Sequence, residues 1–163
     1  MIEEIKQSEY FVVYLDILGY KDFFIKHKDK TEQFLNTINE VFIETIKEIE
    51  KEKQSVNFIK PEIKVFSDNI VIATKCKNKE SDYVVFLDLI RLVAKIQFRF
   101  CIKYGLILRG CITKGSFYIN DNLVFGEALI KSCENEKTAC FPRIILENDY
   151  IEKMIVFINS QVK

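Results

Sequence analysis

The chain has 163 residues, 48% of them hydrophobic, and its 24 basic side chains balance its 24 acidic ones. This length and composition suit one compact domain over residues 1–163, and the zero net charge excludes the basic field of a protein that binds nucleic acid or anionic membranes in bulk. No run approaches the roughly 18 uncharged apolar residues of a membrane-spanning helix, and the acidic start lacks a signal-peptide core, so we expect a cytoplasmic protein.

The first half of the chain predicts a strand, helices and a strand hairpin. Residues 10–18 are β-branched and aromatic and end at Gly19, which indicates a buried strand and a turn. Apolar residues recur every three or four positions from 31 to 53, as in a long amphipathic helix. Residues 63–66 and 70–74 predict two short strands joined through Ser67-Asp68-Asn69, small polar residues typical of a hairpin turn.

The second half predicts a more apolar helix and further strands. Residues 81–103 are apolar over most of a helix surface, which favours packing on a sheet and contact with a second subunit, and Gly105 is an end signal. Strands are expected at 106–113 and 116–119, separated by Lys114-Gly115, followed by a turn at 120–122. A helix from Gly126 to about 136, a strand at 141–146 and a last helix at 150–157, capped by Asn148 or Asp149, complete the chain.

This order of elements, β-α-α-β-β-α-β-β-α-β-α, predicts the fold class. It is typical of an α+β fold with a mostly antiparallel central sheet, and we expect helices to cover one face of that sheet.

Two aspartates lie where a charged side chain is costly. Asp16 belongs to the strand-like apolar run 10–18, and Asp68 lies at a strand end in a second such run, 64–70. A desolvated carboxylate must be paired or bind a cation, so the two together suggest a shared metal site. In the alternative interpretation, Asp16 caps a strand end and Asp68 only opens an Asp-Asn turn.

Cysteine and histidine chemistry is not indicated. The five cysteines show no disulfide or zinc spacing, and most are expected to be small buried thiols: Cys76, Cys101, Cys111, Cys133 and Cys140. The only histidine, His27, lies in a charged cluster, so a catalytic triad is not expected.

Several motifs follow one another between residues 10 and 146. Asp16-Ile17-Leu18-Gly19-Tyr20 is similar to an Asp-Ile-x-Gly-Phe signature, Ser67-Asp68 to a second metal-aspartate hairpin, and Arg109-Gly110 with Gly115 to an Arg-Gly strand pair. Together they resemble the catalytic domain of class III nucleotidyl cyclases. Segments 126–129 and 136–144 resemble more closely the small bacterial pyrimidine cyclases of the Pycsar antiphage system.

The resemblance implies an enzyme that converts UTP or CTP to cyclic UMP or cyclic CMP and pyrophosphate, as a messenger that a separate effector protein reads in antiviral defence. Two Mn²⁺ or Mg²⁺ ions per active site would be held by Asp16, Asp68 and the backbone carbonyl of Ile17, since hard cations prefer oxygen ligands. Gly19 and Tyr20 would form the turn under the phosphates. The family also implies a homodimer with composite sites and a ferredoxin-like palm, here without the C-terminal strand hairpin of the broader family.

The residue that would read the base is Lys64, four positions before Asp68. A lysine only donates hydrogen bonds, which suits O4 of uracil and favours UTP over CTP. Leu123, at the other base-reading position, lacks the polar group that a purine would need. Alternatively, Lys64 is a solvent-facing strand residue.

The resemblance does not identify the basic side chain that would stabilise the transition state. Purine cyclases have Asn and Arg where this chain has Ile130 and Glu134. The candidates are therefore Arg109, Lys131 and Arg143, and Arg143 is equally suited to a structural ion pair.

Two other functions fit the same residues. One is a catalytically inactive cyclase-like module that binds a nucleotide or a partner domain for regulation. The other is a palm-like nucleotidyltransferase, because two aspartates on adjacent strands are common to phosphoryl-transfer enzymes.

Overall fold

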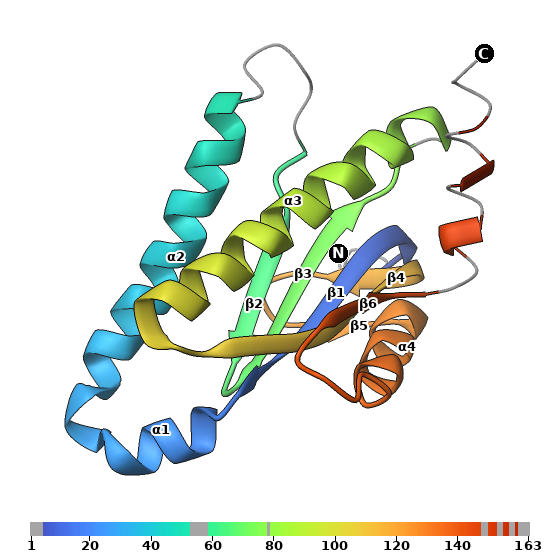
Figure 1. The fold of residues 1–163 in the computed structure, drawn as a ribbon. Coiled ribbons are helices and arrows are strands. Elements are labelled where there is room, and N and C mark those ends of the chain that lie inside the picture. Colours follow the sequence, from blue (N-terminus) through green and yellow to red (C-terminus); the bar gives the residue numbers. More distant parts are fainter. Residues whose placement is uncertain are drawn as a thin grey trace.

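The computed structural model describes residues 5–52, 59–77, 79–147, 150–152, 155–156 and 159. In these ranges a six-stranded sheet has the order β2-β3-β1-β4-β5, with β6 paired to β4 (Figure 1). The strands are β1 (Ser8–Leu18), β2 (Glu62–Phe66), β3 (Asn69–Lys75), β4 (Ile107–Ile119), β5 (Val124–Phe125) and β6 (Ile144–Leu146). The helices are α1 (Tyr20–Lys26), the 3-10 turn η1 (Lys28–Lys30), α2 (Thr31–Glu52), α3 (Lys79–Tyr104) and α4 (Glu127–Glu136).

The central strand β1 pairs antiparallel with β3 on one side and with β4 on the other. Hairpin partners β2 and β3, and β4 and β5, are also antiparallel, whereas β6 runs parallel to β4. The predicted α+β class with a mostly antiparallel sheet is therefore confirmed.

The sheet has helices on both faces, which corrects the expectation of one covered face. Alternate residues of a strand point to opposite faces. Phe11, Val13 and their alternating neighbours join the larger core with α2 and α3, while Tyr10 and Val12 join a smaller core with Ala128 of α4. Figure 1 shows α2 and α3 together on one side of the sheet and α4 apart from them.

A glycine explains how α4 packs so closely on β4. A Cβ atom on Gly115 would lie 3.5 Å from the Cβ of Ala128, so the strand and the helix meet through their smallest residues. Lys114-Gly115 is not the predicted break between two strands. Both residues continue the pairing with β1, opposite Phe11 and Tyr10, and β4 is one strand of 13 residues.

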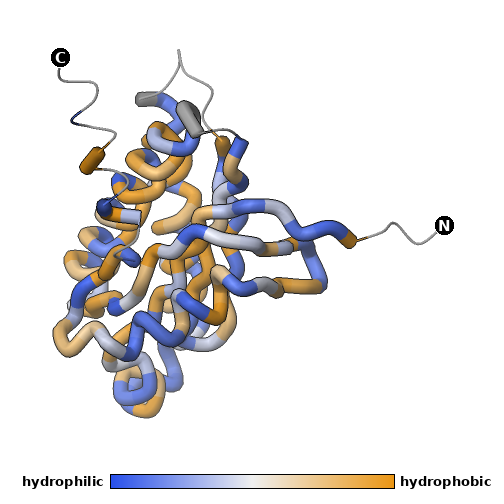
Figure 2. Tube along the Cα trace, turned by 90° about the vertical axis from the view of Figure 1, so that its right-hand side faces the viewer, coloured by the Kyte–Doolittle hydropathy of each residue, from blue (hydrophilic) through white to orange (hydrophobic). Residues whose placement is uncertain are grey.

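Other predicted turns are confirmed. The Asn120 side chain accepts hydrogen bonds from the N–H groups of Asn122 and Leu123 and closes the turn into β5. Gly105, with φ of +65°, ends α3 and donates its N–H to Cys101. Seen from the side, the part of the molecule where the described chain begins extends away from its main body (Figure 2).

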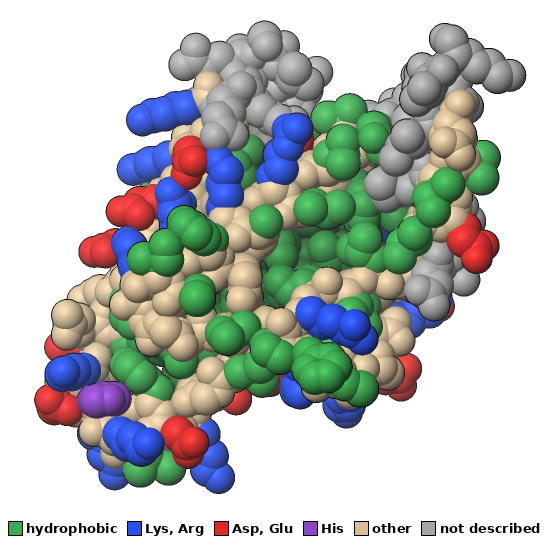
Figure 3. All heavy atoms as spheres, in the orientation of Figure 1, with side chains coloured by type: hydrophobic (Ala, Val, Ile, Leu, Met, Phe, Trp, Pro, Cys, Tyr) green, Lys and Arg blue, Asp and Glu red, His purple; other side chains and the backbone are tan. Residues whose placement is uncertain are grey.

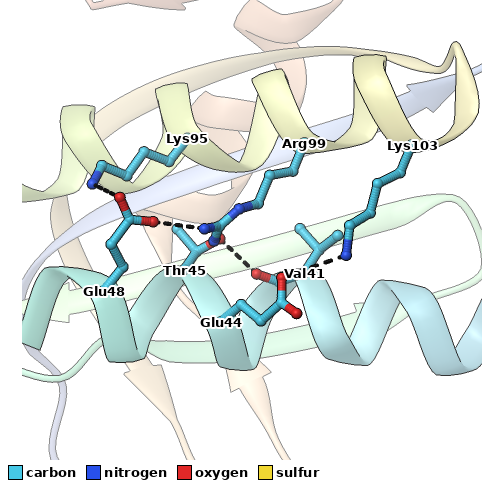
Figure 4. Close-up of polar contacts among 7 residues, drawn as sticks. All are labelled: Val41, Glu44, Thr45, Glu48, Lys95, Arg99 and Lys103. Atoms are coloured by element: carbon cyan, nitrogen blue, oxygen red, sulfur yellow. Dashed lines mark hydrogen bonds and ion pairs between the residues drawn. The ribbon is translucent and has the colours of Figure 1, made fainter.

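The long helices α2 and α3 lie side by side and are bridged by ion pairs (Figure 4). Glu48 on α2 accepts from Lys95 and Arg99 of α3, each at 2.6 Å, and Lys103 lies 3.4 Å from Glu44. These partly exposed pairs contribute at most about 1 kcal/mol each, so the buried apolar contacts of the larger core hold the helices on the sheet.

Apolar side chains on the outward side of α3 are exposed to solvent. Phe98 and Ile102 are each 65% exposed, and Figure 3 shows hydrophobic side chains on this face while charged ones gather over α2. The expected packing of this helix on the sheet is confirmed, and the expected second subunit stays a prediction. Within the described ranges, none of the helices has the length and apolar character needed to cross a bilayer.

The last predicted helix is only partly described. Residues 150–152 and 155–156 are helical, and the ring of Tyr150 packs edge-on against Phe11 and Phe86. The proposed caps, Asn148 and Asp149, lie outside the described residues.

The cysteines differ in exposure more than the sequence suggests. All five are free; Cys111 is buried and Cys76 and Cys133 are partly buried, but Cys101 and Cys140 are exposed. Burial raises the pKa of the Cys76 and Cys111 thiols to about 12, so neither is a nucleophile at neutral pH.

Candidate functional site

The two predicted metal-binding aspartates come together where β1 meets the β2–β3 hairpin. Asp16 is the cross-strand partner of Asn69, the residue that follows Asp68. The N–H of Ile17 also donates to the backbone carbonyl of Asp68 at 2.8 Å. The hairpin turn is as predicted, and its tightness shows at Ser67, whose φ is +58°.

A hydrogen-bond chain orients Asp68. Asn69 donates its side-chain N–H to the Asp68 carboxylate at 2.9 Å, and the Tyr14 hydroxyl donates to the Asn69 side-chain oxygen. Tyr14 packs in the smaller core and lies two residues before Asp16, so both point to the α4 face. Burial, first of all, raises the pKa of the Tyr14 hydroxyl to about 12, with further contributions from the negative groups around it: Cys133, Glu136, Asp16 and Asp68. Asp68 is thus held beside Asn69, the cross-strand partner of Asp16.

Arg109 joins this group from β4. It is the cross-strand partner of Asp16, and its Nη2 lies 3.3 Å from the Asp16 carboxylate. Its Nε donates to Glu136, which lies in the last turn of α4 with a side chain only 6% exposed. Glu136 was not predicted as a site residue. Its position could have been found from helical spacing, because the buried residues of α4 are four apart: Ala128, Ser132 and Glu136.

The electrostatic balance of the site is negative. Burial and then the charge of Glu136 raise the pKa of Asp16 above its usual 3.8; Arg109 opposes this shift and Asp68 adds to it. Three carboxylates therefore outweigh one guanidinium, and the charged form of Asp16 is disfavoured in the folded chain.

Asp16→Asn is expected to stabilise the fold at pH 7 by about 1 kcal/mol, within the usual range for removing an unfavourable charge. Because the pKa of Asp16 is raised on folding, its ionised form costs stability above the folded-state pKa. That cost disappears as the pH falls below the unfolded-state value near 3.8, so the gain should vanish in acid. Urea titrations at pH 7 and pH 3.5 measure both; a destabilised variant at pH 7 would contradict the assignment.

The aspartate pair suits a hard cation that arrives with a phosphate ligand. Within the ranges that the structure describes, no group of three His, Cys, Asp or Glu side chains is arranged to hold a metal ion. Mg²⁺, however, is commonly bound through one or two carboxylates, with water and substrate phosphates completing its octahedron. Asp16 and Asp68 provide that ligand chemistry.

The predicted phosphate turn lies directly after β1. Gly19 precedes α1 with φ of +79°, a conformation that favours glycine. The ring of Tyr20 stacks on Phe24 and lies 5.7 Å from Phe34, so this side chain packs against the larger core. The predicted phosphate contact uses the backbone at Gly19 and Tyr20, and it stays a prediction.

The other predicted binding residues lie apart from the aspartates. Lys64 is the cross-strand partner of Val71, which places it on the α4 face, and its Nζ lies 3.4 Å from Asp121. Arg143 is exposed, and its carbonyl accepts the N–H of Gly110. Among the described residues, no hydrogen bond or ion pair joins either cation to Asp16 or Asp68.

Of the three basic side chains considered for charge stabilisation, Arg109 contacts Asp16. Lys131 instead lies 2.9 Å from Glu127 on its own helix and 4.0 Å from Glu147.

Comparison with solved structures finds a class III adenylyl cyclase-like ATP-binding protein from Pseudomonas aeruginosa, with a TM-score of 0.56 and 14% sequence identity. The match covers 88% of this chain and 34% of the other, so the chain spans about a third of that protein's length. No protein-family model matches the sequence, and no curated protein does. The likeness shows that the fold is class III cyclase-like, as predicted.

Proposed function

We propose that this chain is a nucleotide cyclase that converts a pyrimidine triphosphate, UTP or CTP, to the 3′,5′-cyclic monophosphate and pyrophosphate. The observation that carries the proposal is the meeting of Asp16 and Asp68 in a cyclase-like sheet, beside Arg109. The structural neighbour is described as ATP-binding, which supports a nucleotide as the ligand of this fold.

In this reaction the ribose 3′-oxygen bonds to the α-phosphorus, the bond from that phosphorus to the β-bridging oxygen breaks, and the hydroxyl proton passes to solvent. Two bound Mn²⁺ or Mg²⁺ ions would activate the attacking oxygen and neutralise the leaving charge. Asp16, Asp68 and the Ile17 carbonyl would hold these ions. Arg109 would meet the negative charge on the phosphates, and the backbone at Gly19 and Tyr20 would position them.

The preference for a pyrimidine rests on two residues of the α4 face and the β4–β5 turn. Lys64 shares the face of Asp16, and its contact with the fully exposed Asp121 side chain is weak and easily exchanged for a base. Leu123, 47% exposed, offers no hydrogen bond to a purine.

A homodimer is part of the proposal. Four apolar side chains of β5, its turn, α4 and the segment after α4 are exposed, as at a protein interface: Leu123, Phe125, Ile130 and Phe141. A partner subunit on this side would complete the nucleotide site. The cyclic product would then act on a separate effector in antiviral defence.

The test is incubation of the folded chain with each of the four ribonucleoside triphosphates and Mn²⁺, with mass spectrometry of the products. A cyclic pyrimidine monophosphate is expected. No cyclic product from any of the four, with protein shown by light scattering to be dimeric, would reject the proposal.

Lys64→Met is expected to raise KM for UTP about tenfold with little change in kcat, because one hydrogen bond from a cation to the base, roughly 1.4 kcal/mol, is lost. Steady-state kinetics with UTP and CTP measure it, and CTP turnover should change less. Lys75→Met, at an exposed position on the end of β3, is the matched control. If the two variants change KM for UTP equally, Lys64 does not bind the base.

A second candidate is a catalytically inactive cyclase-like module that binds a nucleotide for regulation. The contact of Arg109 with Asp16 favours it, because a guanidinium occupies one carboxylate that a cation would need. Calorimetry separates the two functions: nucleotide binding that is unchanged by Asp16→Ala and Asp68→Ala would favour the inactive module.

A further inference from the structure

Arg109 lies between two carboxylates, and it is bound more tightly by one of them than by the other. Its Nε is in close hydrogen-bond contact with Glu136, whose side chain is 6% exposed. Its Nη2 is 3.3 Å from Asp16, whose side chain is 22% exposed. A buried charge pair is screened less by water than a partly exposed one. Glu136 is therefore the firm partner of Arg109, and Asp16 is the exchangeable one.

We propose that Arg109 is a resident counter-ion that competes with the divalent cation for Asp16, and that Glu136 is a positioning residue that keeps the guanidinium in the site when the cation enters. This inference rests on the proposed function in one respect: it takes Asp16 as a cation ligand.

The competition follows from charge and geometry. A cation that binds the Asp16 carboxylate replaces Nη2 as its partner and repels the guanidinium at short range. Glu136 belongs to α4, and the buried Ala128 anchors that helix in the smaller core of the sheet. Arg109 therefore shifts about its Nε anchor instead of leaving, and it stays beside the phosphates whose charge it would neutralise.

Arg109 would thus offset part of the negative charge of the carboxylates around it before a cation binds. Without Glu136, the guanidinium would have Asp16 as its remaining acidic partner among the contacts described for it, and cation binding would have to break that pair outright. Without Arg109, the Asp16 carboxylate would be open to the cation.

The test measures binding of Mn²⁺ alone to the full chain, by electron paramagnetic resonance of the free ion. Arg109→Gln is expected to bind Mn²⁺ about tenfold more tightly than the unaltered chain, within the usual range of coupling between sites. Glu136→Gln is expected to bind it several-fold more weakly. Glu48→Gln, which removes the acidic partner of Arg99 on the α2–α3 surface, is the matched control and should leave Mn²⁺ binding unchanged.

The double variant separates positioning from direct ligation. If Glu136 acts through Arg109, Glu136→Gln weakens Mn²⁺ binding less in the Arg109→Gln background than in the unaltered chain. An equal or larger loss there would mean that Glu136 binds or attracts the cation itself, and it would overturn the positioning role. Unchanged or weaker binding in Arg109→Gln, in protein with an unaltered circular dichroism spectrum, would overturn the competition.

These outcomes are independent of product formation. Tighter Mn²⁺ binding by Arg109→Gln in a chain that makes no cyclic nucleotide would support the counter-ion role and reject the cyclase. If the chain makes a cyclic nucleotide but its Mn²⁺ affinity is the same with and without Arg109, the result would support the cyclase and reject the counter-ion role.

Discussion

Asp68→Asn is expected to lower cyclic nucleotide formation at least about 10³-fold. The substituted amide keeps the size of the side chain, and its oxygen can still accept the hydrogen bond from Asn69, so the hairpin turn should persist. It lacks the negative charge that a divalent cation needs. Cation chemistry at phosphates is worth several kcal/mol, and each 1.36 kcal/mol is tenfold in rate.

The measurement is initial rate with UTP and Mn²⁺, together with the thermal shift that Mn²⁺ and nucleotide cause. Asp29→Asn, an exposed aspartate of η1, is the matched control and should retain full activity and thermal shift. If Asp68→Asn kept more than a tenth of the activity, Asp68 would not be a metal ligand and the alternative interpretation, an Asp-Asn turn, would be sufficient.

The positions of the two aspartates could be predicted because each depends on local signals. The apolar run that ends at Gly19 defines β1, and the small polar residues around Asp68 define a hairpin. A strand that ends beside a hairpin turn brings their polar residues together through backbone pairing, which needs no knowledge of how helices pack.

Glu136 and Tyr20 illustrate what local signals leave out. Glu136 enters the site only because α4 docks on the face opposite α2 and α3, where Ala128 packs in the smaller core. The ring of Tyr20 lies 5.7 Å from the ring of Phe34 and packs against the larger core, a contact that local signals do not predict. Both outcomes are set by tertiary packing.

The strand β4 was divided in the prediction for a similar reason. Lysine followed by glycine is common in turns, and nothing nearby in the sequence contradicts a break there. Long-range pairing with β1 instead carries β4 through Gly115, and Arg109 reaches Asp16 on the same continuous ladder. Gly115 is thus a paired residue within β4, and Arg109, on the same strand, is paired with Asp16 of β1.

Gly110→Ala is expected to destabilise the fold by about 3 kcal/mol or more, at the upper end of overpacking effects. A Cβ at this position would lie 2.2 Å from the backbone oxygen of Tyr14 and 2.6 Å from a methyl carbon of Leu15. The backbone oxygen cannot rotate away, so β4 must separate from β1. For a chain of this size each kcal/mol lowers Tm by about 2–4 °C, so thermal unfolding should shift by roughly 6–12 °C.

Gly115→Ala on the same strand is the matched control. Its Cβ would meet Ala128 at 3.5 Å, an ordinary contact, so its Tm should change by no more than a few degrees. Separation of β4 from β1 at Gly110 would also pull Arg109 from Asp16, since the two are partners one residue away. Gly110→Ala should therefore lose cyclase activity at temperatures where it is still folded, whereas Gly115→Ala should not. Equal Tm values for the two variants would show that the sheet relaxes around a Cβ at position 110. The close approach of β1 and β4 would then not be what keeps Arg109 beside Asp16.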